Sequence, residues 1–143
     1  DGTPVFGGEY QFRYGAADVV REGGDAAIVV SGALCSNAIA AHELLRGQGI
    51  AARVIHVATP LALDETVMKA AVATGVIVSV EDHVVTSGLG TSVAEFLAAH
   101  GLACTLAKLG VTSYASSGTP KALFAEYHLD AAGIAATVQR LKQ

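Results

Sequence analysis

Two short apolar runs, residues 26–30 and 76–80, constrain the fold of this chain more than any other feature. Both are rich in valine and isoleucine, both have the length of a β-strand, and neither alternates with charged residues. Such runs are typical of strands that are covered on both faces. A sheet with both faces covered requires helices on each side of it, so these runs predict an α/β protein.

The rest of the chain alternates strand-like and helix-like patterns. Further strands are predicted at 17–21, 52–57 and 103–109. Helices are predicted over 34–45, 64–73 and 91–99, with two more beginning at the N-caps Thr119 and Asp130. Alternation of this kind indicates a mostly parallel five-stranded sheet between two helical layers, a three-layer α/β/α sandwich.

The domain organisation is expected to be simple. Residues 1–12 are rich in glycine and aromatic residues and lack periodicity, which favours an incoming linker. Residues 13–143 are then a single domain of ordinary size. Because the chain begins in a linker, we expect it to be part of a longer protein.

Composition excludes several functional classes. Nine lysines and arginines against 13 acidic residues give a net charge of −4, which disfavours nucleic-acid binding. The longest uncharged stretch, 26–42, is broken by polar residues and is too short for a membrane span. With 52% hydrophobic and 15% charged residues, we expect a surface hidden against partner chains. Cys35 and Cys104 lack metal or redox spacing, so a reducing cytoplasm is the expected setting.

The candidate site residues follow buried strands. Glu81, Asp82 and His83 come after the run 76–80, at the edge where open α/β sheets usually bind ligands. An acid–base cluster is conceivable, but adjacent residues in an extended segment point in opposite directions, which favours an interface or loop-pinning role. Two predicted helix starts could bind an anion through free N–H groups. Their residues are Gly88, Gly90 and Thr91 in one case and Ser31 and Gly32 in the other. In the first case, close packing of loop against loop is favoured over anion binding.

Four segments in order resemble the C-terminal domain of transketolases. The segment EDHVVTSGLGTSVAEFLAAHG (81–101) resembles that domain's Glu-Asp-His, glycine-rich loop and helix, and YGAADVVREGGDAAIVVS (14–31) its entry strand and first central strand. Residues 31–64 are similar to its Ser-Gly helix and next strand, and SGTPKALFAEYHLDAAGI (117–134) to its closing helices. His128 departs from this pattern, because a glycine usually follows the tyrosine there.

The resemblance implies an antiparallel first edge strand and a role in a thiamine-diphosphate enzyme that moves a two-carbon ketol unit between sugar phosphates. In that family the cofactor and Mg²⁺ lie between two other domains, so the resemblance implies a chain that binds no cofactor and has no catalytic residue. Its expected task is assembly with other transketolase domains or subunits, in a homo-oligomer or hetero-oligomer.

Two alternatives remain open at this point. The chain could be a regulatory module that binds a sugar phosphate or another anion through the two helix starts. It could also be the related domain of a 2-oxo-acid dehydrogenase beta chain or of a deoxyxylulose-phosphate synthase.

Overall fold

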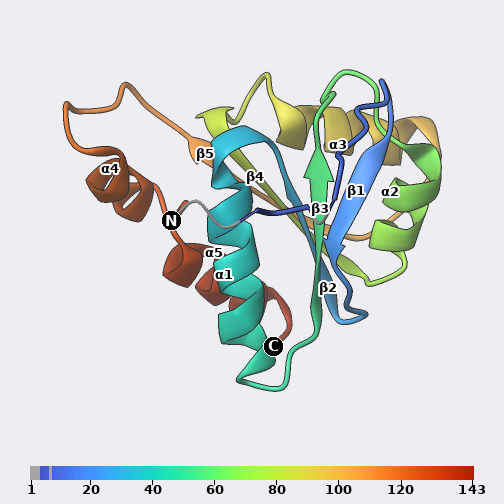
Figure 1. Cartoon of the computed structure of the whole chain (residues 1–143), viewed down its shortest axis with the longest axis horizontal. Coiled ribbons are helices and arrows are strands. Elements are labelled where there is room, and N and C mark those ends of the chain that lie inside the picture. The colour runs from blue at the N-terminus through green and yellow to red at the C-terminus, as the bar shows by residue number, and fades with distance from the viewer. Residues whose placement is uncertain (1–3, 7) are drawn as a thin grey trace.

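A computed structural model describes residues 4–6 and 8–143 of the chain. Its core is a five-stranded sheet with the strand order β1-β3-β2-β4-β5 (Figure 1). Strands β2, β3, β4 and β5 run parallel, whereas β1 pairs antiparallel with β3 at one edge. The strands are β1 (Ala17–Arg21), β2 (Ala26–Val30), β3 (Ala52–Val57), β4 (Val76–Val84) and β5 (Thr105–Val111). The mostly parallel sheet and its antiparallel edge strand are therefore confirmed.

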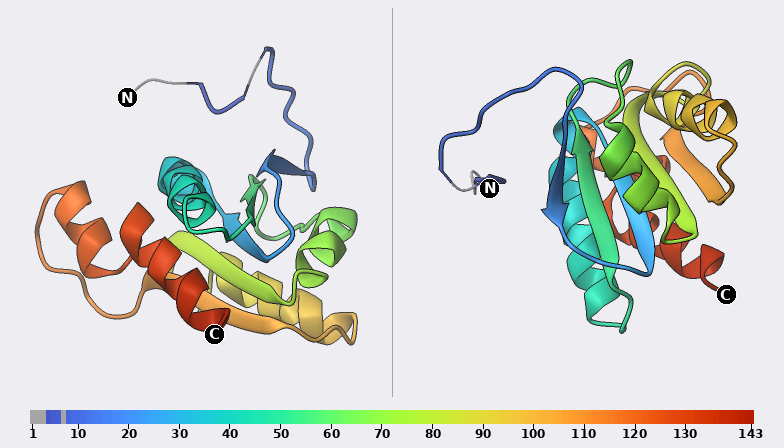
Figure 2. Two further views of the ribbon diagram at one scale, coloured as in Figure 1. Left: turned by 90° about the horizontal axis from the view of Figure 1, so that it is seen from below. Right: turned by 90° about the vertical axis from the view of Figure 1, so that its right-hand side faces the viewer.

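Helices cover both faces of the sheet, which gives the predicted three layers. The helices are the short 3-10 turn η1 (Gly32–Leu34), α1 (Cys35–Arg46), α2 (Glu65–Val72), α3 (Leu89–Ala99), α4 (Pro120–Glu126) and α5 (Ala131–Leu141). Helices α1 and α5 lie on one face, and α2 and α3 on the other (Figures 1 and 2). Helix α4 lies to one side of these layers.

Two apolar clusters separated by the sheet form the core. On the α1/α5 face, Ile28 and Val78 pack with Leu34 and Ile134. On the α2/α3 face, Ile77 packs with residues such as Met68, Leu89 and Val93. All five residues of β2 are buried, as expected for a run without polar alternation.

Local capping residues fix several helix starts where the sequence predicted them. The side chains of Asp64, Thr119 and Asp130 accept hydrogen bonds from backbone N–H groups in the first turns of α2, α4 and α5. A cap of this kind satisfies one of the N–H groups that a helix start leaves free. These three predictions are confirmed.

Strand β4 is longer than the sequence predicted. It continues past Val80 to Val84, with a shift in register against β5 before the pair Val84 and Val111. Glu81, Asp82 and His83 therefore belong to the strand rather than to the loop after it. The sequence predicted a strand over 76–80 only, and the strand is longer because pairing with β5 extends beyond the apolar residues.

The segment between β5 and α5 is largely exposed. Residues 112–122 are all exposed, and α4 contains no buried residue. We call residues 112–128 the α4 arm. It ends at His128, which has a φ of 58° and is the one residue other than glycine with a positive φ among the described residues.

The described residues before β1 contain no helix or strand. Within them the rings of Phe6 and Tyr10 stack at 4.6 Å, and the Tyr10 hydroxyl donates to Asp18 of β1. The predicted linker over 1–12 includes residues 1–3 and 7, which lie outside the described residues. No helix in the described part of the chain is both long and apolar enough to cross a membrane.

Candidate functional site

The carboxylate of Glu81 is buried at the carboxyl end of β4, where it closes a turn onto helix α3. It is 2% exposed. One oxygen accepts a hydrogen bond from the Leu89 N–H at 2.7 Å, and the other accepts from the Gly90 N–H at 2.9 Å. These donors are among the free N–H groups of the α3 start, where negative charge is also favoured by the helix dipole. We call residues 81–91 the Glu81 turn.

Two glycines allow this close approach. A Cβ atom on Gly88 would lie 1.6 Å from the Glu81 carboxylate, and one on Gly90 would lie 2.5 Å from the Ser79 hydroxyl. Neither glycine has a positive φ, so space rather than backbone conformation excludes a side chain. The sequence predicted close packing or anion binding here, and the structure places a carboxylate of the chain itself against these amides.

Lys108 of β5 adds a contact that the sequence analysis missed. Its ammonium donates to the Val85 carbonyl at 2.8 Å, and the Thr91 hydroxyl donates to the same carbonyl at 3.2 Å. The signal was present as the single lysine of an otherwise uncharged strand. The contact with the Val85 carbonyl could not be predicted, because it depends on the register of β4 and β5, in which Ser79 pairs with Lys108.

Asp82 and His83 do not join Glu81 in one cluster. Both are exposed. His83 lies near Gly88 on the α3 side. Asp82 lines a groove with residues of the α4 arm and α5 start, such as Phe124 and Leu129. Glu81 and His83 therefore lie on the α3 side of β4 and Asp82 lies on the opposite side, so the three side chains cannot act on one substrate atom.

Ser31 and Gly32 lie at the same edge of the sheet but on its other face. The Ser31 N–H donates to the Val80 carbonyl at 3.3 Å, and Gly32, with a φ of 63°, begins η1 in front of α1. Since α1 and α3 cover opposite faces, the two predicted anion-binding helix starts do not form a joint site.

Cys35, the first residue of α1, is buried. Burial raises the pKa of its thiol, whereas a reactive cysteine needs a lowered pKa.

An open hollow lies between the α2 start and α3, with a volume of about 340 Å³. Its charged or ionisable lining residues are Glu65, Glu95 and His100. The Lys69 ammonium donates to Glu65 and lowers the pKa of that carboxyl, so Glu65 is ionised near neutral pH. A carboxylate-lined hollow disfavours a sugar phosphate or another anion.

The described residues do not fit the metal and cofactor that the resemblance implies for the whole enzyme. Mg²⁺ takes several oxygen ligands in near-octahedral geometry. Nowhere in residues 4–6 and 8–143 do three His, Cys, Asp or Glu residues gather as metal ligands. Both oxygens of the buried Glu81 carboxylate already accept hydrogen bonds from backbone N–H groups.

Comparison with known proteins gives a consistent family. The family model described as "Transketolase, C-terminal domain" matches residues 15–134. A 1-deoxy-D-xylulose-5-phosphate synthase from Syntrophotalea carbinolica is 38% identical over 127 residues, which cover 87% of this chain and 20% of that protein. A putative transketolase C-terminal section from Methanocaldococcus jannaschii is 34% identical over 128 residues, covering 89% of this chain and 40% of that protein.

A solved structure agrees with these sequence matches. The chain described as "Split gene transketolase, inactive beta4 tetramer" superimposes with a TM-score of 0.90 and 34% identity, over 99% of this chain and 48% of that chain. The chain thus spans between a fifth and two-fifths of the curated relatives described here. By sequence and by fold, it belongs to the transketolase C-terminal domain family.

Proposed function

We propose that this chain is the non-catalytic C-terminal domain of a transketolase-like, thiamine-diphosphate-dependent ketol transferase, and that it supports subunit assembly and the dimer interface. The observation that carries the proposal is the Glu81 carboxylate. It accepts hydrogen bonds from the α3 amides that a bound phosphate would need. The Glu-Asp-His segment and the glycines after it therefore hold a turn in place.

Thiamine diphosphate and Mg²⁺ bind, in this proposal, to other domains of the enzyme. Thiamine diphosphate, once bound there, supplies the carbanion chemistry of the transfer. This domain supplies packing surfaces instead, and the chain is inactive in isolation. The proposal includes a cytoplasmic setting and partnership with the other transketolase domains or with a second subunit. Free thiols at Cys35 and Cys104 are consistent with that setting.

The relatives of this chain also include a second type of enzyme. A 1-deoxy-D-xylulose-5-phosphate synthase is 38% identical over 127 residues, the putative transketolase C-terminal section is 34% identical over 128, and a 6-deoxy-6-sulfo-D-fructose transketolase subunit is 42% identical over 88. The domain could therefore serve a synthase of that type with the same packing role. The regulatory anion-binding alternative has less support, because its two helix starts lie on opposite faces of the sheet.

The proposal can be tested by complementation. A partner that carries the two thiamine-binding domains but lacks its last domain is mixed with this chain, and ketol transfer from xylulose 5-phosphate to ribose 5-phosphate is measured. Formation of 1-deoxy-D-xylulose 5-phosphate is measured in parallel with the corresponding synthase partner. We expect that, for one of the two partners, either the enzymatic activity or the stability of the dimer rises only when this chain is added.

Calorimetric titration of the isolated chain with xylulose 5-phosphate is the matching control. Saturable binding there, with no effect on either partner, would overturn the assembly role and favour the regulatory module. The reaction that responds in the complementation assay decides between transketolase and synthase.

A further inference from the structure

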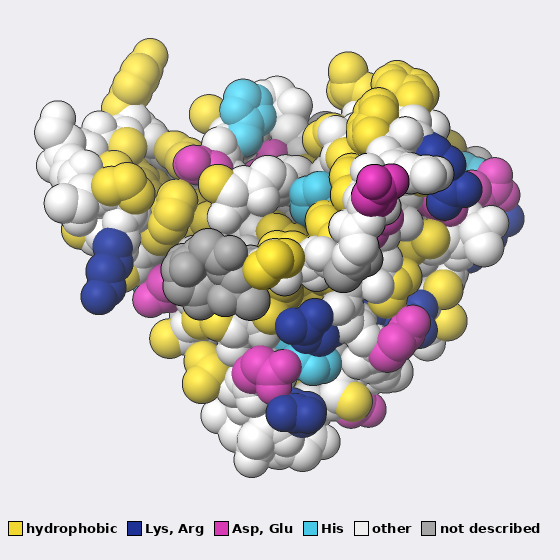
Figure 3. All heavy atoms as spheres, in the orientation of Figure 1, with side chains coloured by type: hydrophobic (Ala, Val, Ile, Leu, Met, Phe, Trp, Pro, Cys, Tyr) yellow, Lys and Arg dark blue, Asp and Glu magenta, His cyan; other side chains and the backbone are white. Residues whose placement is uncertain are grey.

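The other described residues cover the α4 arm only in part: Phe124 and Tyr127 pack against the α1/α5 cluster, whereas Tyr114 is fully exposed. In Figure 1 the arm extends away from the sheet at one side, and in Figure 3 separate hydrophobic side chains lie among polar ones over it. Its helix has seven residues, none of them buried. A helix this short is not stable on its own in water, so further packing would stabilise it.

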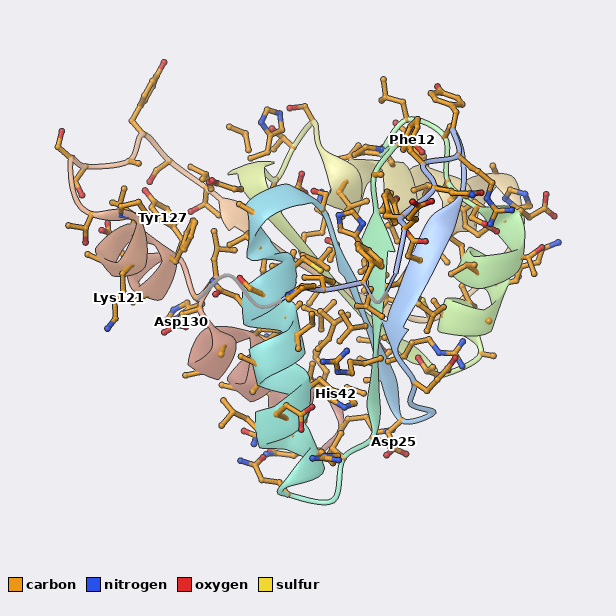
Figure 4. All side chains as sticks on the ribbon, in the orientation of Figure 1. Phe12, Asp25, His42, Lys121, Tyr127 and Asp130 are labelled. Carbon is orange, nitrogen blue, oxygen red and sulfur yellow. The ribbon has the colours of Figure 1, made fainter. Side chains whose placement is uncertain are left out.

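A groove lies where the arm meets the carboxyl ends of β4 and β5. Its volume is about 170 Å³. Its lining consists of Asp82, Val111, Ala115, Pro120, Leu123, Phe124, Tyr127 and Leu129. In Figure 4, Tyr127 lies on the side of α4 nearer the sheet, whereas Lys121 points away from it. Asp82 supplies the one charged group among these lining residues.

The size and chemistry of the groove suit one phenol ring. A protein cavity of about 150 Å³ lined by apolar side chains accommodates benzene. The groove is slightly larger and has a carboxylate as well as apolar walls, so it can hold a ring that bears a hydrogen-bond donor. A phenol hydroxyl that donates to a carboxylate forms a charge-assisted hydrogen bond.

Such a ring is present on the same arm. Tyr114 lies in the loop before α4 and is fully exposed. In a two-fold symmetric contact between identical chains, each copy must offer both halves of the contact. This chain meets that requirement, because the groove and the Tyr114 ring lie on the same arm. Buried tyrosines in small pockets are also frequent energetic centres of protein interfaces.

We propose that two copies of this chain associate through their α4 arms, with Tyr114 of each copy inserted into the groove of the other and its hydroxyl donating to Asp82. This inference rests on the assembly role proposed above and identifies the surface that serves it. The contact also covers the exposed loop and the short helix α4.

Sedimentation equilibrium of the 143-residue chain tests the contact. We expect a reversible self-association that Tyr114→Ala weakens at least tenfold in Kd, as for an interface hot spot. Tyr114→Phe and Asp82→Asn should each weaken it several-fold, because the first removes the hydroxyl donor and the second removes the negative charge of the acceptor. The double variant should weaken it no more than Tyr114→Phe alone, because without the hydroxyl no such hydrogen bond is left to weaken. Tyr14→Ala, at another exposed tyrosine, should leave the Kd unchanged.

Two results would overturn the proposal. One is a chain that remains monomeric up to about 1 mM, the weak end of specific association. The other is an association that Tyr114→Ala leaves intact. Binding of a free phenol, such as p-cresol, by a monomeric chain would assign the groove to a small aromatic ligand instead.

The complementation assay separates this inference from the function on which it rests. If ketol transfer depends on the chain but self-association does not depend on Tyr114, the surface is wrong and the assembly role stands. If Tyr114-dependent dimers form while neither activity responds to the chain, the assembly role is wrong and the contact stands.

Discussion

The Glu81 turn and the α4 arm both connect a strand to a helix at the carboxyl edge of the sheet, yet they are held in opposite ways. In the turn, a carboxylate and two glycines make short contacts within the chain, and Lys108 of β5 donates to the Val85 carbonyl. In the arm, residues 112–122 are all exposed. The comparison teaches that the motif most suggestive of chemistry is structural, and that the plainer segment has surface to offer a partner.

The largest loss of stability is expected from Gly88→Ala in the Glu81 turn. The new Cβ would lie 1.6 Å from a Glu81 carboxylate oxygen, so the buried carboxylate must move and lose its hydrogen bonds. We expect the free energy of unfolding to fall by about 3 to 4 kcal/mol, measured by urea denaturation. Gly24→Ala is the control, because nothing lies within 4 Å of its Cβ position, and equal losses for the two variants would contradict this account.

Glu81→Gln tests the same turn without a steric change. The amide keeps the shape of the side chain but replaces one acceptor oxygen by a donor, which then faces a backbone N–H of Leu89 or Gly90. One buried N–H is left without a partner, which costs about 2 kcal/mol of unfolding free energy. Glu95→Gln on the exposed side of α3 is the control and should change stability by less than about 0.5 kcal/mol.

Removing matched N-caps compares the arm directly with the body of the fold. Asp130 and Thr119 make the same type of cap, on α5 and α4 respectively. Helix α5 packs into the core through Ile134 and Val138, so Asp130→Ala should lower the free energy of global unfolding by about 1 kcal/mol.

Thr119→Ala should instead act locally. Because α4 has no fully buried residue and contacts the core only through partly buried side chains such as Phe124, we expect it to unfold without loss of the core. We expect the global unfolding free energy of the monomeric chain to change by less than about 0.5 kcal/mol, while amide hydrogen exchange in α4 becomes faster. A global loss as large as that of Asp130→Ala would show that the arm is part of the cooperative fold.

The same contrast explains what could be predicted from the sequence. Asp64, Thr119 and Asp130 were identifiable as caps because each acts within three residues of itself. The Glu81 bonds were not identifiable, because they join residues eight positions apart in the sequence, and the path of the chain between β4 and α3 decides whether these residues meet. The contacts of Lys108 depend on strand register, and the groove depends on the position of α4, so neither could be assigned from the neighbouring residues in the sequence.

The residue that joins the arm to the body gives the smallest predicted effect. His128 has a φ of 58°, a left-handed conformation that costs roughly 1 kcal/mol or more for a residue with a side chain. Glycine tolerates this conformation but loses more entropy on folding, so His128→Gly should raise the free energy of unfolding by only about 0.5 kcal/mol. His128→Ala removes the imidazole and retains the strain, and should bring no gain. If both variants are less stable than the parent chain, the exposed imidazole contributes to the junction. If glycine alone stabilises without slowing hydrogen exchange in α4, the strain belongs to the α5 start and the arm remains an independent unit.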